Sequence, residues 1–271
     1  MKAAAASLLL ACILVLLPFA LAEPRGELFD GDYSAVVTDK DGEILRVYLN
    51  SEEQWILPPA SDLPEKLVTG VLNYEDRYFF NHGGVNPVSV LRAAGQNIRA
   101  GKSLSGASTI TMQLARIAKP KGRSLINKIK EIFSAVKLEF LYNKEEILAL
   151  YLNHAPYGGN IRGVRAASLR YFGKEASALT WAEAACLAVL PNAPGLISPG
   201  REAERLLEKR NRLLEELRRS GHMDEDDLAL AKAEPLPEKE MPFPNLAPHF
   251  ADHLLGASNN RRDPNGSIQS T

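Results

Sequence analysis

Apolar residues recur at helical spacing from about residue 64 onward, and no alternating run in that part of the chain is long enough to build a sheet. Capping-box pairs predict the starts of two helices, at Asn143 with Glu146 and at Thr180 with Glu183. A highly charged helix is expected over about residues 202–219, with four leucines on one inward stripe: Leu206, Leu213, Leu214 and Leu217. The pattern therefore predicts a mainly α domain.

The N-terminal residues follow a different pattern. Residues 3–22 are apolar and uncharged, which suits either a membrane anchor or a signal peptide cleaved after Ala22, and both alternatives stay open. Beyond them, apolar runs at 35–37 and 44–49 flank the turn sequence of residues 39–42, which predicts a short β-hairpin. The expected organisation is a signal peptide or anchor over 1–22, a linker with the hairpin over 23–54, one helical domain over 55–235 and a polar tail over 236–271.

Composition narrows the choice of ligands. With 271 residues and 45% hydrophobic content, the chain can bury one sizeable core. Its net charge of −1 conceals a basic run between Arg116 and Lys137, interrupted only by Glu131, which should attract anions. Because aromatic residues are scarce in this run, a nucleic-acid groove is disfavoured, and a phosphorylated or lipid-phosphate ligand fits better. The two cysteines support neither a disulfide framework nor a cysteine metal site.

The first segment with candidate chemistry is E-D-R-Y-F-F-N-H-G-G at residues 75–84. Glu75 continues the apolar face of the helix before it, where desolvation would raise its pKa and suit it to general acid–base catalysis. The simpler alternative is a carboxylate at a helix end, paired with Arg77 or His82.

The second segment, G-A-S-T-I-T-M-Q-L-A-R at residues 106–116, follows a small, polar loop and enters a helix. Ser108 or Thr109 would cap this helix, and the backbone N–H groups at its start would form a general anion site. A plain N-cap is the simpler interpretation, but Arg116 and the basic run beyond it favour an anion-binding wall.

The third segment is R-S-L-I-N-K-I-K-E at residues 123–131. We expect its helix to turn one apolar stripe inward: Leu125, Ile129, Ile132, Phe133, Val136 and Phe140. Lys128 and Glu131 lie off that stripe, so their simplest role is an ion pair on a solvated surface. A functional role would require this polar side to face a cleft.

Together and in this order, the three segments resemble the peptidoglycan glycosyltransferase domain of class A penicillin-binding proteins. That family has the patterns E-D-x-x-F-x-x-H-x-G, G-x-S-T-x-T-Q-Q-x-x-K and R-x-x-x-x-K-x-x-E, and its fourth pattern, K-x-x-I-L-x-x-Y-L-N, matches residues 144–153. The likeness covers roughly residues 55–220, with Met112 and Arg116 where the family commonly has Gln and Lys. Met112 and the Asn86-Pro87 pair make the chain most similar to the penicillin-binding protein 1C branch.

The resemblance implies a lysozyme-like, mainly α fold with a short N-terminal hairpin and a small membrane-proximal lobe. It implies an inverting glycosyltransferase that polymerises lipid II into β-1,4 glycan strands and releases undecaprenyl pyrophosphate. In that chemistry Glu75 is the general base, Asp76 orients the site, and Glu131 is the second catalytic residue. The residues implied to bind the pyrophosphate and the substrate are Arg92, Ser108, Gln113, Arg116, Arg123, Lys128 and Lys130.

The same resemblance implies no required cofactor, although Glu131 either orders the cations or holds a divalent ion such as Mg²⁺ or Mn²⁺. The implied partners are lipid II, glycan linked to undecaprenyl pyrophosphate, cell-wall synthesis proteins and the membrane surface, which Tyr78, Phe79 and Phe80 would enter unless they belong to the core. The implied location is the bacterial inner membrane, with the catalytic domain in the periplasm or outside the cytoplasmic membrane. The polar tail stops about where a transpeptidase domain would begin in bifunctional relatives.

Two other functions stay open. A lysozyme-like peptidoglycan hydrolase also uses one glutamate in a helical fold, but it does not need the basic run from Arg116 to Lys130. A noncatalytic, membrane-tethered glycan-binding fragment would keep its core and should lose the acid and the cations, whereas Glu75, Lys128 and Glu131 are present.

Overall fold

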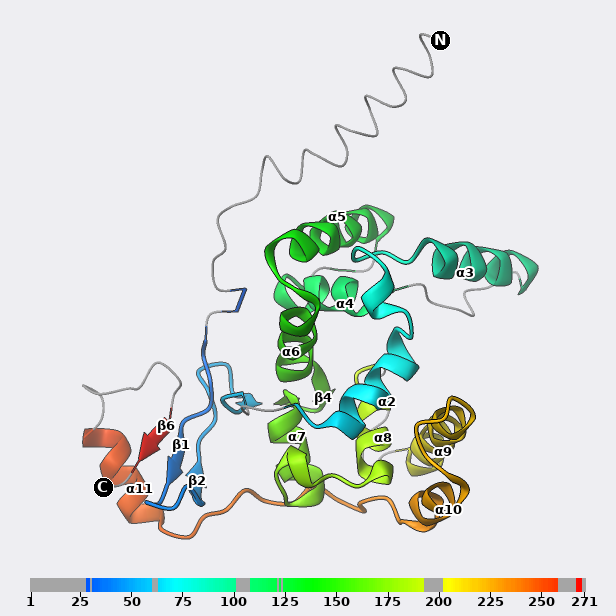
Figure 1. The fold of residues 1–271 in the computed structure, drawn as a ribbon. Coiled ribbons are helices and arrows are strands. Elements are labelled where there is room, and N and C mark those ends of the chain that lie inside the picture. The colour runs from blue at the N-terminus through cyan, green and yellow to red at the C-terminus, as the bar shows by residue number, and fades with distance from the viewer. Residues whose placement is uncertain are drawn as a thin grey trace. The chain divides into compact units, whose positions relative to one another are not determined.

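The structure is a computed structural model that describes residues 28–29, 31–59, 63–100, 108–120, 122, 124–192, 202–257 and 267–269 (Figure 1). The chain forms two compact units. The first includes Tyr78–Tyr151, and the second comprises Phe29–Arg77 and Leu152–Thr271. Helices dominate both units, which confirms the expected mainly α class.

The second unit is built around helix α8 (Trp181–Val189), in which every residue from Ala184 to Val189 is buried. Around it lie α2 (Glu65–Glu75), α7 (Val164–Phe172), α9 (Ala203–Arg219) and α10 (Glu225–Ala233), and the 3₁₀ turn η2 (Ala176–Ala178) packs against α7. Gly70 allows α2 to approach α8 closely, since a Cβ at this position would lie 3.3 Å from the Cβ of Ala188.

The helix signals of this unit were read correctly from the sequence. Thr180 and Glu183 form the predicted capping box at the start of α8. All four leucines of the predicted α9 stripe are buried. Arg210 is buried on the same stripe at 1% exposure, although the sequence predicted only leucines there.

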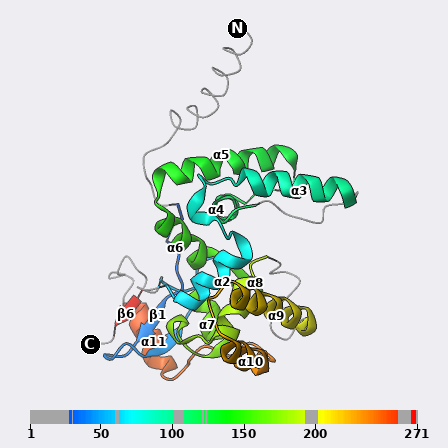
Figure 2. The ribbon, with the colours of Figure 1, turned by 45° about the vertical axis from the view of Figure 1, so that its right-hand side comes forward.

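Two small sheets complete the second unit. The predicted hairpin is present as β1 (Val36–Thr38) and β2 (Ile44–Val47), paired antiparallel. A third strand, β6 (Ser267–Gln269), pairs parallel with β1, and α11 (Pro248–Ala257) lies against β2 (Figures 1 and 2). The second sheet has the order β3 (Trp55–Ile56), β5 (Ile161–Arg162) and β4 (Pro156–Gly158).

The second sheet contradicts the expectation that no sheet forms beyond residue 64. Its strands are two or three residues long, too short to show an alternating pattern. They are ordered by long-range pairing instead, as where Trp55 in β3 lies opposite Ile161 in β5.

The first unit contains η1 (Phe79–Asn81), α3 (Pro87–Ala100), α4 (Ile110–Ala118), α5 (Leu125–Leu141) and α6 (Lys144–His154), whose last three residues belong to the second unit. Residues 110–115 of α4 are all buried, and α5 packs along α4. The predicted capping box of α6 is confirmed, with Asn143 and Glu146 each accepting the other's backbone N–H at 2.8 Å.

The prediction for the inward face of α5 was wrong. Its buried residues are Ala135 and Leu138, whereas Ile129, Phe133 and Phe140 are 46%, 37% and 55% exposed. Small and medium side chains thus face α4, and the largest apolar groups point outward. The side chain of Leu125 lies outside the described part of the structure.

The described residues contain no helix long and apolar enough to cross a membrane. The predicted signal peptide or anchor over residues 1–22 and the loop at 101–107 both lie outside that part. The proposed division at residues 22, 54 and 235 therefore stays a prediction.

Candidate active site

The acidic pair of the first segment lies at the end of α2 in the second unit. Glu75 is the last residue of the helix, half-buried, with its Oε1 atom buried. Asp76, 7% exposed, caps the helix, and its backbone N–H donates to the carbonyl of Leu72 at 3.0 Å. Leu67 and Val71 are fully buried on the same helix, so Glu75 does follow an apolar face.

Lys209 of α9 interacts electrostatically with this acid. Burial lowers the pKa of Lys209, as does the nearby Arg205, whereas Glu75 acts to raise it. Burial and then Glu75 raise the pKa of Tyr74 to about 12. Arg77, one of the partners considered for Glu75, forms an ion pair with Glu216 at 3.3 Å.

The second segment forms the N-terminus of α4 in the first unit. The hydroxyl of Thr109 accepts the backbone N–H of Met112 at 3.2 Å, which confirms that one of the two predicted residues is the N-cap. The same hydroxyl donates to the carbonyl of Gly84 at 2.6 Å. The loop of residues 82–84 is thereby fixed against the start of α4.

A partly buried polar network around Glu139 of α5 supports this arrangement. Glu139 accepts a hydrogen bond from Thr111 at 2.5 Å and forms an ion pair with Lys144 at 2.8 Å. Lys144 also donates to the carbonyl of His82 at 2.7 Å, and its ammonium lies 4.2 Å from the centre of the Phe79 ring. In the sequence, Lys144 is recognisable only as part of a motif, and Glu139 carries no recognisable signal.

Ser108, Lys128 and Glu131 meet beside the N-terminus of α4. The Lys128 ammonium donates to Ser108 Oγ at 2.7 Å and to Glu131 Oε2 at 2.9 Å. Glu131 is only 17% exposed in its side chain, so this is not the solvated surface pair that spacing alone suggested. An ammonium has three donors, and among the described residues these two contacts use two of them, which leaves one for an anion.

The other predicted site residues of the first unit are more dispersed. Gln113 is buried and accepts a hydrogen bond from the Tyr151 hydroxyl at 3.3 Å. Arg92 on α3, Arg116 on α4 and Lys130 on α5 are exposed. Arg123 lies outside the described residues. The structure thus brings Ser108, Lys128 and Glu131 into contact, while the assignment of the remaining residues stays a prediction.

The described residues include no group of three or more His, Cys, Asp or Glu side chains that could hold a metal ion. Glu131, the predicted ligand, already neutralises Lys128. A divalent ion at Glu131 would compete with that ammonium and would need phosphate or water oxygens to complete its coordination.

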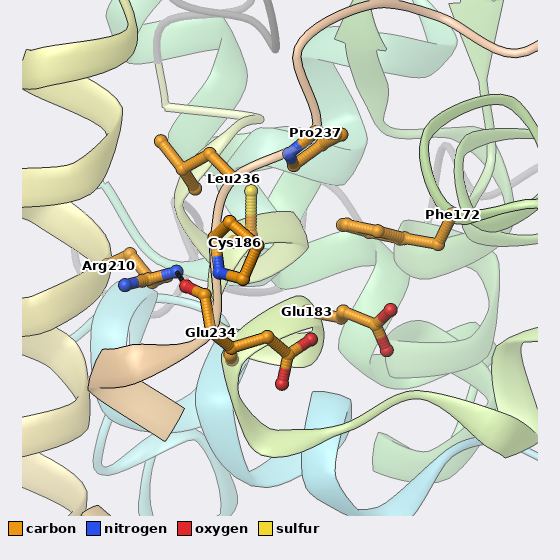
Figure 3. A pocket seen from close by; sticks show the side chains of 9 residues that line it. Phe172, Glu183, Cys186, Arg210, Glu234, Leu236 and Pro237 are labelled. Carbon is orange, nitrogen blue, oxygen red and sulfur yellow. Dashed lines mark hydrogen bonds between the residues drawn. The ribbon is translucent and has the colours of Figure 1, made fainter. Parts of the chain in front are cut away.

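A small hollow between α8, α9 and the segment after α10 is a structural feature (Figure 3). The Arg210 guanidinium fills one side of it and donates to the carbonyls of Glu234 at 2.6 Å and Lys232 at 3.2 Å. These are carbonyls at the C-terminal end of α10. The lining also includes Cys186, whose thiol has its pKa raised to about 12 by burial. A phosphorylated sugar would not fit this hollow, because the Arg210 guanidinium fills one side of it and the chemistry of its lining does not suit a phosphate.

Comparison with known proteins agrees with these features. Residues 41–218 match the transglycosylase family. Penicillin-binding protein 1C of Escherichia coli is 40% identical over 224 residues, which are 82% of this chain and 29% of that protein. Penicillin-binding protein 1A of Aquifex aeolicus is 38% identical over 191 residues, which are 70% of this chain and 26% of that protein. The chain thus spans less than a third of the length of these relatives.

A crystal structure of penicillin-binding protein 1A from Haemophilus influenzae aligns with 88% of this chain and 27% of that one, at a TM-score of 0.44 and 20% identity. The assignment therefore rests on the sequence match, which covers about two thirds of the chain and includes all three candidate segments. The chain belongs to the transglycosylase family.

Proposed function

We propose that this chain is a peptidoglycan glycosyltransferase that polymerises lipid II into β-1,4 glycan strands and releases undecaprenyl pyrophosphate in cell-wall biosynthesis. The observation that carries the proposal is the cluster of Ser108, Lys128 and Glu131 at the start of α4. It offers a fixed ammonium with one donor left unused by the described residues, which suits a phosphate group better than a neutral sugar.

The reaction needs a base for the acceptor and charge stabilisation for the leaving group. Glu75 would take the proton of the acceptor's 4-hydroxyl as its oxygen attacks the anomeric carbon of the donor. The bond from that carbon to the pyrophosphate oxygen breaks with inversion, and its electron pair leaves with the pyrophosphate. Lys128 would stabilise the negative charge that develops there.

Other residues would tune this charge. Arg116 and Lys130 are exposed, and neither has a structural role among the described contacts. The resemblance adds Arg123 to these cations. Glu131 orders Lys128 through their 2.9 Å contact. Because the cations are supplied by the chain, no step of this scheme requires a metal, and a Mg²⁺ or Mn²⁺ ion at Glu131 would only supplement them.

We also propose that the first unit meets the membrane surface, at the outer face of the bacterial inner membrane. Helices α3 and α5 lie at the same end of this unit (Figures 1 and 2). They expose large apolar side chains: Val88, Val90, Leu91, Ile126, Ile129, Phe133 and Phe140. Tyr78 and Phe80 are also exposed, whereas Phe79, which the sequence analysis grouped with them, is fully buried. Such a surface suits a substrate with a lipid tail.

The two alternatives fit less well. A hydrolase of glycan strands releases no pyrophosphate and gives no reason for Lys128 to be held by two polar partners. A noncatalytic fragment gives no reason for a glutamate at the end of an apolar helix face with a lysine that interacts with it. Recruitment by other cell-wall synthesis proteins would belong to the longer relatives and is a further proposal.

The test is polymer formation from labelled lipid II by the purified chain in detergent, with Glu75→Gln as the variant. Glu65→Gln is the matched control, because it makes the same change at an exposed position on the same helix. We expect glycan polymer from the wild type and the control and none from Glu75→Gln. Equal polymer from all three would reject Glu75 as the base. Shortening of preformed glycan would select the hydrolase, and no activity from folded wild type would select the noncatalytic fragment.

A further inference from the structure

The feature behind the inference is a lysine that no motif includes. Lys209 lies on the face of α9 toward α2, and its side chain is half-buried. Its ammonium donates to Asn192 Oδ1 at 3.2 Å and lies 5.9 Å from the centre of the Tyr74 ring. These two contacts hold the ammonium beside Tyr74, the residue before Glu75, and close enough for Glu75 to act on the pKa of Lys209.

The other charges facing the end of α2 are more exposed or already paired. On α9, Arg205 is near Glu202 at 3.9 Å and Arg212 pairs with Glu208 at 3.2 Å, and both arginines are exposed. These charges are screened by solvent more strongly than Lys209.

The remaining neighbours of α2 add little positive charge. Directly after the helix come Asp76 and then Arg77, which pairs with Glu216. On α8 the titratable groups are Glu183, paired with Lys174 at 2.7 Å, and Cys186. Compared with Arg77, Arg205 and Arg212, Lys209 is the least exposed, and it interacts electrostatically with Glu75.

We propose that Lys209 is a positioning residue that keeps Glu75 ionised and oriented for proton transfer. The inference rests on the proposed function, in which Glu75 is the base. Burial alone would favour the neutral carboxyl, which cannot accept a proton, whereas a nearby ammonium favours the carboxylate. The interaction is mutual, because Glu75 in turn raises the pKa of Lys209 against the effects of burial and Arg205.

Asn192 fixes the position of the Lys209 ammonium. Its amide oxygen accepts from the Lys209 ammonium and so fixes one of three donor directions without adding a competing negative charge. An acidic residue at that position would neutralise the lysine and weaken its effect on Glu75. The neutral amide leaves the positive charge available to the acid.

The experiment measures kcat/KM for lipid II polymerisation against pH in four forms of the full chain: wild type, Lys209→Gln, Lys209→Arg and Arg218→Gln. Arg218→Gln is the matched control, because it removes a positive charge from the same helix roughly 13 Å further along, beyond the Debye length at physiological salt. We expect the acid limb of the Lys209→Gln profile to move up by about 0.5–1 pH unit. The Lys209→Arg and Arg218→Gln profiles should match the wild type.

A second readout separates this inference from the proposed function. The carboxyl carbon of Glu75 is titrated by ¹³C NMR in the folded chain, with Glu75→Gln identifying its signal. An upward shift of its midpoint in Lys209→Gln supports the inference even if the wild type polymerises nothing, which would reject the proposed function alone. An unchanged midpoint, or an acid limb that moves equally in Lys209→Arg, would overturn the inference whatever the activity.

Discussion

Gly84 gives the sharpest test of how the first unit holds its candidate site. Its backbone has a φ of +83°, and a Cβ at this position would lie 2.9 Å from the carbonyl oxygen of Ala135 in α5. The neighbouring Gly83 has no atom within 4 Å of the equivalent position and no positive φ. Gly84→Ala and Gly83→Ala therefore form a matched pair of identical chemical changes one residue apart.

Two effects would lower the stability of the Gly84→Ala variant. A left-handed backbone costs a residue with a Cβ about 1–2 kcal/mol. Crowding a packed interface costs about 1–3 kcal/mol, and here the neighbour is helix backbone, which cannot rotate away. The alanine also restricts the unfolded chain, which stabilises the folded state by about 0.4–1 kcal/mol. A net destabilisation of about 2–4 kcal/mol follows, which corresponds to a fall in Tm of roughly 5–15 °C.

Thermal unfolding followed by circular dichroism, together with polymer formation from lipid II, measures the outcome. Gly84→Ala should lower Tm as stated and reduce polymer below the Tm, because the carbonyl of Gly84 accepts from the Thr109 hydroxyl at the start of α4. Gly83→Ala should leave Tm within about 2 °C of the wild type, since one exposed substitution has an effect of about 0.5 kcal/mol or less. Equal Tm values for the two variants would refute the reasoning.

Two further outcomes follow from the second unit. Cys186 should resist a thiol reagent at pH 8 in the folded chain and react after denaturation, because burial raises its pKa to about 12, and rapid labelling of folded protein would contradict its placement. The Tyr48 hydroxyl donates to Asp252 at 2.7 Å, which lowers the pKa of Asp252, while burial and this bond raise that of Tyr48 to about 12. The carboxylate's contribution to stability is therefore lost as pH falls below about 4, and the tyrosine's as pH rises from about 10 to 12. Thermal melts against pH should show a weaker dependence at both ends in Tyr48→Phe, and an unchanged profile would count against the contact.

The features that could be predicted from the sequence are those made by neighbours along the chain. The caps at Thr109, Asn143 and Thr180 follow from residues three positions apart, so a single helical turn specifies them. The hairpin of β1 and β2 is specified in the same way by the turn between its strands. The three segments of the candidate site are likewise short motifs, and one of them contains the cap at Thr109.

The features that were missed depend on distant partners. The strand β5 gains its register from β3, more than 100 residues earlier, and two residues carry no periodic signal. The direction of α5 was misjudged because its larger apolar residues, such as Phe133 and Phe140, face outward. Arg210 did leave a signal, since it lies on the stripe of Leu206 and Leu213, where an arginine must find buried acceptors.

The hydroxyl of Thr109 has a consequence for how the first unit folds. One oxygen both caps α4 and bonds the carbonyl of Gly84, 25 residues earlier in the chain. A local event, the closing of the first helical turn, is thereby tied to a contact that requires a loop to close, which is slower. The start of α4 should consequently become protected from hydrogen exchange together with the 82–84 loop. A serine at this position would preserve that coupling, whereas the equally bulky valine would uncouple the two segments.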